Sequence, residues 1–193
     1  MTDQHHPPAG FDNTEAGTAW STELVTITGF RTQVRPARPA DRDALTAFFG
    51  SLGPEDIYFR FLSPLARVDE GRLAAMTRIN DPHTIDFLAF ALNRPDEVIA
   101  SAMLTADEGF ATAEVALAIR PDHKSRGISW ALLDHVSRYA AVHGVGTLFA
   151  IHSGADSRAT ALERETGFTV RRDPGDPTLM IAEKQLAPVP AGA

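Results

Sequence analysis

Residues 113–144 read AEVALAIRPDHKSRGISWALLDHVSRYAAVHG, a β-rich run, a short polar loop and a long amphipathic segment in direct succession. The segment from residue 128 onward predicts a helix that ends at Gly144, because its apolar residues fall along one side. These residues are Ile128, Leu132, Leu133, Val136 and Ala140. The apolar run VGTLFAI (145–151) follows and is typical of a strand buried in a parallel pairing. Strand, helix and strand together predict a right-handed crossover.

The sequence on either side of this unit predicts antiparallel strands and further helices. Upstream, the patterns indicate a hairpin around Gly29, an amphipathic helix, two shorter helices and an antiparallel strand pair, in segments 23–38, 39–52, 54–62, 69–80 and 84–104. Downstream, they indicate a helix at 157–167 and a closing hairpin at 168–186. We therefore expect an α+β fold with a mixed, mostly antiparallel sheet that is flanked by helices and contains one βαβ crossover.

Length and composition favour one soluble globular domain. The chain has 193 residues, of which 44% are hydrophobic and 22% charged. The polar start and the end APVPAGA lack apolar periodicity. We expect flexible tails at 1–20 and 188–193 around a domain at 21–187.

Several classes of protein are disfavoured by charge and residue usage. A net charge of -7 provides no broad field for nucleic acid. No apolar run approaches the roughly 20 residues that span a bilayer, and the start does not resemble a signal peptide. We therefore expect no nucleic-acid or membrane partner and a cytoplasmic location. The absence of cysteine excludes disulfides, thiolate zinc sites and cysteine nucleophiles. His135 and His143 lie eight residues apart on the expected helix, too far to share an ion, so we expect no metal site.

The loop between the central strand and helix is a candidate anion site. Free backbone N–H groups and the positive end of the helix dipole gather there, and Gly127 would let a ligand approach the backbone closely. Lys124 and Arg126 add formal positive charge. From these residues alone, an ordinary loop with a solvated basic pair is an equal alternative.

The same loop resembles the acyl-CoA signature of GNAT N-acetyltransferases. That signature has six positions: Gln or Arg, any two residues, Gly, any one residue, and Gly or Ala. Here it consists of Lys124, Ser125, Arg126, Gly127, Ile128 and Ser129. Lys124 and Ser129 depart from the pattern. Lys124 keeps the positive charge of the first position, and Ser129 keeps the small size of the last. The resemblance covers residues 22–186, and VTITGFRTQVRPARPADRDAL with SLGPEDIYFRFLS is similar to bacterial protein lysine acetyltransferases that regulate acetyl-CoA synthetase.

The resemblance implies a cofactor, a binding path and a set of contacts. Acetyl-CoA would donate the acyl group, without a metal, and its pyrophosphate would bind at the loop. The pantetheine arm would follow a strand that splays from its neighbour, at residues Leu117, Ala118 and Ile119. Asp156 stands where many members have a cofactor-contacting Asn, and Glu163 stands where many have a Tyr that protonates the thiolate.

Glu114 is the candidate general base, because the lysine acetyltransferases resembled here carry a glutamate at this strand position. By strict alternation, Val115 and Leu117 share one face of the strand, and Glu114 and Ala116 share the other with small neighbours. The alternative is a solvent-facing strand glutamate. A base is needed because the amine of lysine, with a pKa of about 10.4, must lose a proton during attack.

Three functions remain open. The first is acetylation of a protein lysine, with an acyl-CoA synthetase as a possible acceptor. The second is acetylation of a small amine such as a polyamine or aminoglycoside, which an acidic surface would attract. The third is a non-catalytic acyl-CoA sensor. Residues 53–80 would set specificity, and we expect a monomer or homodimer.

Overall fold

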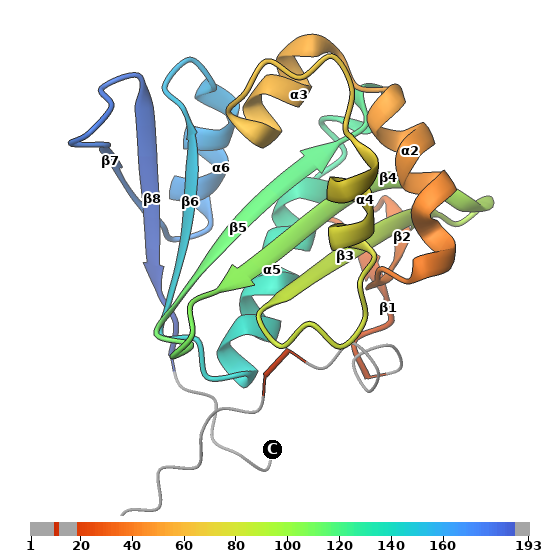
Figure 1. Cartoon of the computed structure of the whole chain (residues 1–193), viewed down its shortest axis with the longest axis horizontal. Coiled ribbons are helices and arrows are strands. Elements are labelled where there is room, and N and C mark those ends of the chain that lie inside the picture. Colours follow the sequence, from red (N-terminus) through yellow and green to blue (C-terminus); the bar gives the residue numbers. More distant parts are fainter. Residues whose placement is uncertain (1–9, 12–18, 188–193) are drawn as a thin grey trace, which may run out of the picture.

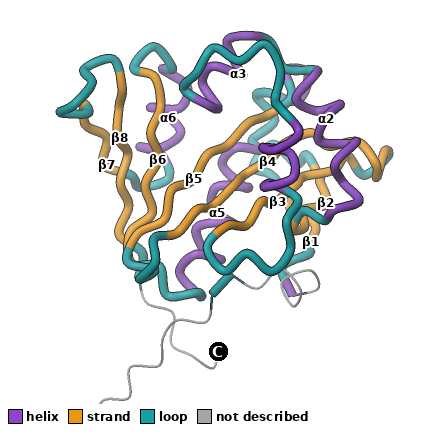
Figure 2. Tube along the Cα trace, in the orientation of Figure 1, coloured by secondary structure: helices purple, strands orange, loops and turns teal. Residues whose placement is uncertain are grey.

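The computed structural model describes residues 10–11 and 19–187, and its centre is an eight-stranded sheet (Figures 1 and 2). The strand order is β1-β2-β3-β4-β5-β6-β8-β7. Every neighbouring pair is antiparallel except β5 and β6, which are parallel. The strands are β1 (Thr22–Val25), β2 (Arg31–Pro36), β3 (Thr84–Ala91), β4 (Arg94–Ala106), β5 (Thr112–Ile119), β6 (Thr147–Ser153), β7 (Thr169–Arg172) and β8 (Leu179–Gln185).

Helices cover both faces of the sheet. In Figure 1, α2 and α4 lie in front of the central strands, α3 lies at the top of the view above the end of β5, and α5 lies behind the sheet. The helices are η1 (Pro39–Asp41), α2 (Arg42–Gly50), α3 (Pro54–Phe61), α4 (Glu70–Met76), η2 (Pro121–His123), α5 (Ile128–Val142) and α6 (Ser157–Glu165). The α5 helix connects the two parallel strands, so it forms the crossover that the sequence predicts.

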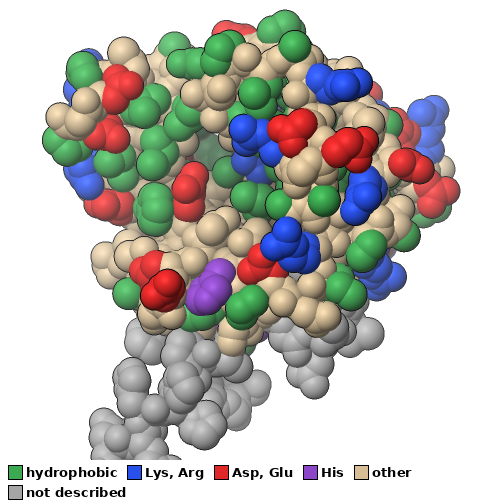
Figure 3. Space-filling model, in the orientation of Figure 1, with side chains coloured by type: hydrophobic (Ala, Val, Ile, Leu, Met, Phe, Trp, Pro, Cys, Tyr) green, Lys and Arg blue, Asp and Glu red, His purple; other side chains and the backbone are tan. Residues whose placement is uncertain are grey.

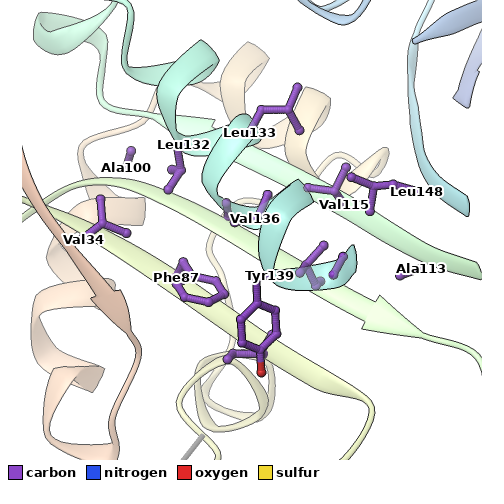
Figure 4. Packing of buried hydrophobic residues seen from close by; sticks show 14 of the residues in the cluster. Val34, Phe87, Ala100, Ala113, Val115, Leu132, Leu133, Val136, Tyr139 and Leu148 are labelled. Atoms are coloured by element: carbon purple, nitrogen blue, oxygen red, sulfur yellow. The ribbon is translucent and has the colours of Figure 1, made fainter. Parts of the chain in front are cut away.

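The larger core lies between α5 and the sheet. Figure 4 shows Leu132, Val136 and Tyr139 of α5 packed over Phe87 and neighbouring strand residues. Leu132, Val136 and Tyr139 are fully buried. Burial of a leucine or valine side chain such as Leu132 or Val136 contributes about 1.5–3 kcal/mol. This packing holds the start of α5 firmly against the end of β5, where the candidate loop lies.

A second core lies on the opposite face, beneath α2, α3 and α4. It includes Leu45 and Phe48 of α2, Ile57 of α3, and Leu88 and Ala118 of the sheet. The alternation predicted for β5 is therefore present, since Val115 and Ile119 belong to the α5 core and Ala118 belongs to this one. This second core holds α3 against the sheet, above the end of β5.

The predicted α+β fold class and the crossover are confirmed. The strand pair β3–β4 differs in detail: β4 begins at Arg94, within the expected turn, and the register shifts between Ala89 and Ala91. Most of the expected N-terminal tail lies outside the described residues, as does 188–193. Phe11 is nevertheless 2% exposed with its ring against Phe110, and Trp20 packs on Tyr139. Those two residues of the expected tail therefore contribute to the core.

Candidate functional site

The parallel strands β5 and β6 separate partway along their length. They pair only from Thr112 to Glu114, opposite Thr147 to Phe149. Beyond Glu114, β5 pairs on its other side with β4, and β6 pairs with β8. The splay that the resemblance implied is therefore present. The β6-facing edge of β5 beyond Glu114, which includes Leu117, Ala118 and Ile119, has no strand partner, and its backbone groups are where the pantetheine arm is predicted to bind.

The loop after β5 leads into a helix start without a side-chain cap. Gly127 is the N-cap of α5, with φ of 76°, and no side chain within residues 10–11 and 19–187 accepts a hydrogen bond from the first turn. Ser125 also has positive φ, at 62°. An uncapped N-terminus leaves N–H groups free for an anion, and the helix dipole favours negative charge there. The geometry at Ile128 and Ser129 therefore fits the diphosphate that the sequence predicts.

The absence of a side chain at Gly127 makes space for Thr26 and Ile27 of this chain, and not only for a ligand. A Cβ atom on this residue would lie 3.1 Å from Cβ of Thr26 and 3.3 Å from Cγ1 of Ile27. The hydroxyl of Thr28 donates a 2.7 Å hydrogen bond to the carbonyl of Arg126. The turn of the β1–β2 hairpin therefore packs on one side of the loop. This contact gives a second reason for the glycine, which the sequence pattern did not reveal.

The charged side chains around the loop have different partners. Lys124 Nζ lies 2.5 Å from Oδ1 of Asp56 in the first turn of α3. The Arg126 guanidinium lies over the ring of Phe30, 5.0 Å from its centroid, and is exposed. Asp122 is held by Arg120 and His123, which together lower the pKa of its carboxyl. The negative charge of the loop is thus locally compensated, and Arg126 remains open to solvent.

Glu114 lies where the two strands begin to separate. Its side chain is half-buried on the face that carries α3, in the same row as Thr105 of β4. Burial raises the pKa of its carboxyl, and the positive charge of Arg60 opposes that rise. A raised pKa suits a group that accepts a proton near neutral pH. The structure therefore places the predicted base beside the splay, on the side opposite α5.

Two buried charged residues near Glu114 escaped the sequence reasoning. Arg60 of α3 is 8% exposed and Asp86 of β3 is 2% exposed. The hydroxyl of Ser101 donates to both carboxylate oxygens of Asp86, at 2.9 and 3.1 Å. Burial raises the pKa of Asp86 to about 7, although Arg60 and Ser101 act to lower it. The sequence contains a sign of both buried charges, because Arg60 and Asp86 each interrupt an otherwise apolar segment.

Asp156 and Glu163 have structural partners within the protein. Asp156 is the N-cap of α6, and its carboxylate accepts from the backbone N–H groups of Arg158 and Ala159 at 3.1 and 3.0 Å. Glu163 is buried, with Oε2 lying 2.9 Å from Nε2 of His152 on β6. Glu163 is the main cause that raises the pKa of this histidine, against the effect of its burial. A cofactor contact by Asp156 stays a prediction, beside its capping role.

A groove opens between α3 and the turn that follows β6. Its volume is about 590 Å³, and its lining includes Tyr58, Phe59, Leu65, Ser153 and Ala155. Figure 3 shows the front face hollowed beneath α3, with hydrophobic side chains inside and Lys or Arg side chains at the edge. This groove reaches Ser153 at the end of β6, four residues beyond Phe149, which pairs with Glu114.

Two further properties bear on the chemistry. Within residues 10–11 and 19–187, no three His, Asp or Glu side chains lie together in a way that could hold a metal ion. In the same part of the chain, no helix has the length and apolar character that crossing a membrane requires.

Comparison with known proteins places this geometry in a family. The sequence model described as "Acetyltransferase (GNAT) family" matches residues 51–168, more than half of the chain. An acetyltransferase of Pseudomonas aeruginosa is 27% identical over 151 residues, which cover 77% of this chain and 80% of the relative. The chain therefore belongs to the GNAT acetyltransferase family.

Solved structures share the fold. The GNAT domain of S. lividans PAT superposes with a TM-score of 0.80 at 22% identity, covering 88% of this chain and 98% of that one. The spermidine N-acetyltransferase of Vibrio cholerae, in complex with CoA and spermine, superposes with a TM-score of 0.65 at 15% identity, covering 80% and 95%. At these identities the structural likeness shows the fold, and the acceptor must be argued from the site.

Proposed function

We propose that this chain is an acetyl-CoA-dependent N-acetyltransferase whose acceptor is a lysine side chain of another protein. One observation carries the proposal: Glu114 stands at the point where β5 and β6 separate, so the predicted base lies beside the opening that would receive the thioester. The uncapped start of α5 would hold the diphosphate, with Arg126 exposed beside it.

The chemistry follows from this placement. The acceptor nitrogen attacks the thioester carbonyl carbon, a C–N bond forms, and the C–S bond breaks. Glu114 accepts the proton that the nitrogen loses, directly or through a water molecule. The sulfur leaves as a thiolate, and because a thiol has a pKa of about 8.5, it is a fair leaving group even where Glu163 replaces a tyrosine. The acetylated amine and free thiol are the products.

The groove beneath α3 favours a long aliphatic amine presented from outside. Its lining combines Tyr58, Phe59 and Leu65 with Glu55 at one side, so apolar surface could hold a methylene chain near an acidic group. The groove is at the surface, which suits a side chain of a folded protein. The fold superposes better on the GNAT domain of S. lividans PAT, with a TM-score of 0.80, than on the spermidine N-acetyltransferase, with a TM-score of 0.65. Within this proposal, an acyl-CoA synthetase in the cytoplasm is a candidate acceptor.

The direct test of mechanism is the variant Glu114→Gln. We expect turnover to fall by about 100-fold or more, while the affinity for acetyl-CoA stays nearly unchanged, because only proton transfer is lost. Glu108→Gln is a matched control, since Glu108 is an exposed glutamate in the turn that precedes β5. Free thiol release measures turnover, and calorimetry measures cofactor affinity. Full activity of Glu114→Gln would remove Glu114 as the base.

A small cationic amine is the second candidate acceptor. The chain is acidic, with a net charge of -7, and a fold neighbour is a spermidine N-acetyltransferase. A panel containing spermidine, an aminoglycoside, a lysine peptide and an acyl-CoA synthetase separates the two. Thiol release with the protein or peptide alone supports the first proposal, and release with the small amines alone supports the second. Tight binding of acetyl-CoA without turnover on any acceptor favours a sensor role.

A further inference from the structure

Arg60 is a charged residue on the buried face of α3. The residue is 8% exposed, and its Nε and Nη2 atoms are buried without a hydrogen-bond partner among the described residues. A guanidinium does not lose its proton inside a protein, so its charge must be balanced by other groups. Its nearest ring contact is Phe61, whose centroid lies 5.0 Å from Cζ. The positive charge of Arg60 is therefore buried, permanent and not locked into a tight ion pair.

Two carboxylates act on this guanidinium. Asp86 and Glu114 both favour its charged form, whereas Arg72 of α4 opposes it. Asp86 and Ala116 align with Met103 of β4 in one cross-strand row, and Glu114 lies two residues before Ala116, so all four residues occupy one face of the sheet. The α3 helix packs against β5 and β6 on this face. Arg60 thus lies above a sheet surface that holds both acids.

The two acids are not equivalent. Asp86 is fully enclosed and accepts from Ser101, whereas Glu114 is half-buried, with no hydrogen bond or ion pair to another described side chain. Asp86 accepts from Ser101 and forms no ion pair with Arg60 among the described residues, and burial raises the pKa of its carboxyl, so Asp86 does not fully neutralise the guanidinium. The remaining positive field acts on Glu114, and Arg60 is the charged group that opposes the rise in its pKa.

We propose that Arg60 is a positioning residue for acyl transfer: its buried guanidinium keeps the Glu114 carboxylate ionised beside the acceptor, while Asp86 balances the charge from the far side. This inference rests on the proposed role of Glu114 as base. Arg60 touches neither the acceptor nor the donor in this account. It acts because a half-buried carboxylate without hydrogen-bond donors would otherwise take up a proton and lose its ability to accept another.

The test is the pH dependence of kcat/KM between pH 5 and 9. Arg60→Gln removes the charge, so the pKa of Glu114 rises and the acid limb of the profile moves upward by about one pH unit. Part of the activity returns at high pH, where Glu114 is ionised again. Arg60→Lys keeps the charge and returns the limb to its wild-type position, even where the rate is lower. Acetyl-CoA affinity and melting temperature are measured for both variants.

A purely structural role gives a different pattern. In that case Arg60→Gln lowers kcat/KM by the same factor at every pH, the limb stays in place, and the proposal is overturned. If Arg60→Gln does not fold, Asp86→Asn takes over the test. It removes the competing negative charge, so the acid limb moves downward by about half a pH unit. A limb that remains in place or moves upward in this variant overturns the proposal.

The outcome for Glu114 separates this inference from the proposed function. If Glu114→Gln is inactive and the acid limb of Arg60→Gln is unmoved, the assignment of Arg60 fails alone and the acyltransferase mechanism stands. If Glu114→Gln retains full activity, the base is another group, and the assignments of Glu114 and Arg60 fall together.

Discussion

The two halves of the site hold positive charge in opposite ways. On the proposed cofactor side, Lys124 and Arg126 lie on a surface loop, and Lys124 forms an ion pair with one partly exposed carboxylate. On the proposed acceptor side, Arg60 is a buried residue of α3 whose charge interacts with Asp86 and Glu114. A surface charge can exchange its partner for a ligand at small cost, whereas a buried charge is fixed and sets the ionisation of its neighbours. The first arrangement suits binding, and the second suits proton transfer.

The largest effect on the cofactor side is expected for Gly127→Ala. The residue has φ of 76°, and its added Cβ would lie 3.1 Å from Thr26. Left-handed backbone costs about 1–2 kcal/mol for a residue other than glycine, and the contact displaces the hairpin turn from the loop. We expect the affinity for CoA to fall by about 10-fold, equal to about 1.4 kcal/mol. Calorimetry with CoA measures this change.

Gly144→Ala provides the matched control for this variant. Gly144 lies at the other end of α5 and has a similar φ of 84°. It should lose comparable stability in thermal unfolding, yet bind CoA as the wild type does. Equal CoA affinities in the two variants would show that the hairpin contact does not shape the loop.

The fold and the loop that leads into α5 could be predicted from sequence because their signals are local. The helical spacing of apolar residues in 128–143 predicts α5. The residues of the loop, Lys124 to Gly127, are adjacent in the sequence and so can be recognised as one motif. The hairpin contact on Gly127 could not be predicted in this way. About a hundred residues separate Thr28 from Arg126, and only the folded sheet brings them together.

The acceptor side was only partly predictable. Glu114 was found through the resemblance and the alternation of its strand, but Arg60 and Asp86 were missed. Arg60 follows Ile57 by three residues and so lies on the buried face of α3, and Asp86 interrupts the apolar run of β3. A charge in such a position indicates a buried interaction without naming its partner. The partner is fixed by the packing of α3 on β5, which no local pattern encodes.

A smaller effect on the cofactor side is expected for Thr28→Ala. The hydroxyl of Thr28 donates to the carbonyl of Arg126 at 2.7 Å, and one such bond contributes about 1 kcal/mol. Its loss should loosen the loop and raise the Kd for CoA by up to about 5-fold. The pH profile of kcat/KM should not move, because no charge near Glu114 changes.

Thr22→Ala is the control for the hairpin itself. Thr22 lies at the start of β1, and within the described part of the chain its hydroxyl donates only to the adjacent carbonyl of Glu23, at 3.5 Å. A similar rise in Kd in both variants would indicate general weakening of the hairpin rather than support of the loop by Thr28.

The smallest effect is expected for Asp56→Asn, and its sign is informative. Lys124 must release or share Asp56, 2.5 Å away, before it can contact a phosphate, so removal of the carboxylate charge should raise CoA affinity by about 2–5-fold. The gain should shrink with added salt, because both side chains are partly exposed and screened. Glu55→Gln controls for net charge, as Glu55 neighbours Asp56 but forms no ion pair with another described residue. Weaker CoA binding in Asp56→Asn would mean that Asp56 orients Lys124 for the ligand. The positive charge at the loop would then be held in place by its partner, as the charge of Arg60 is.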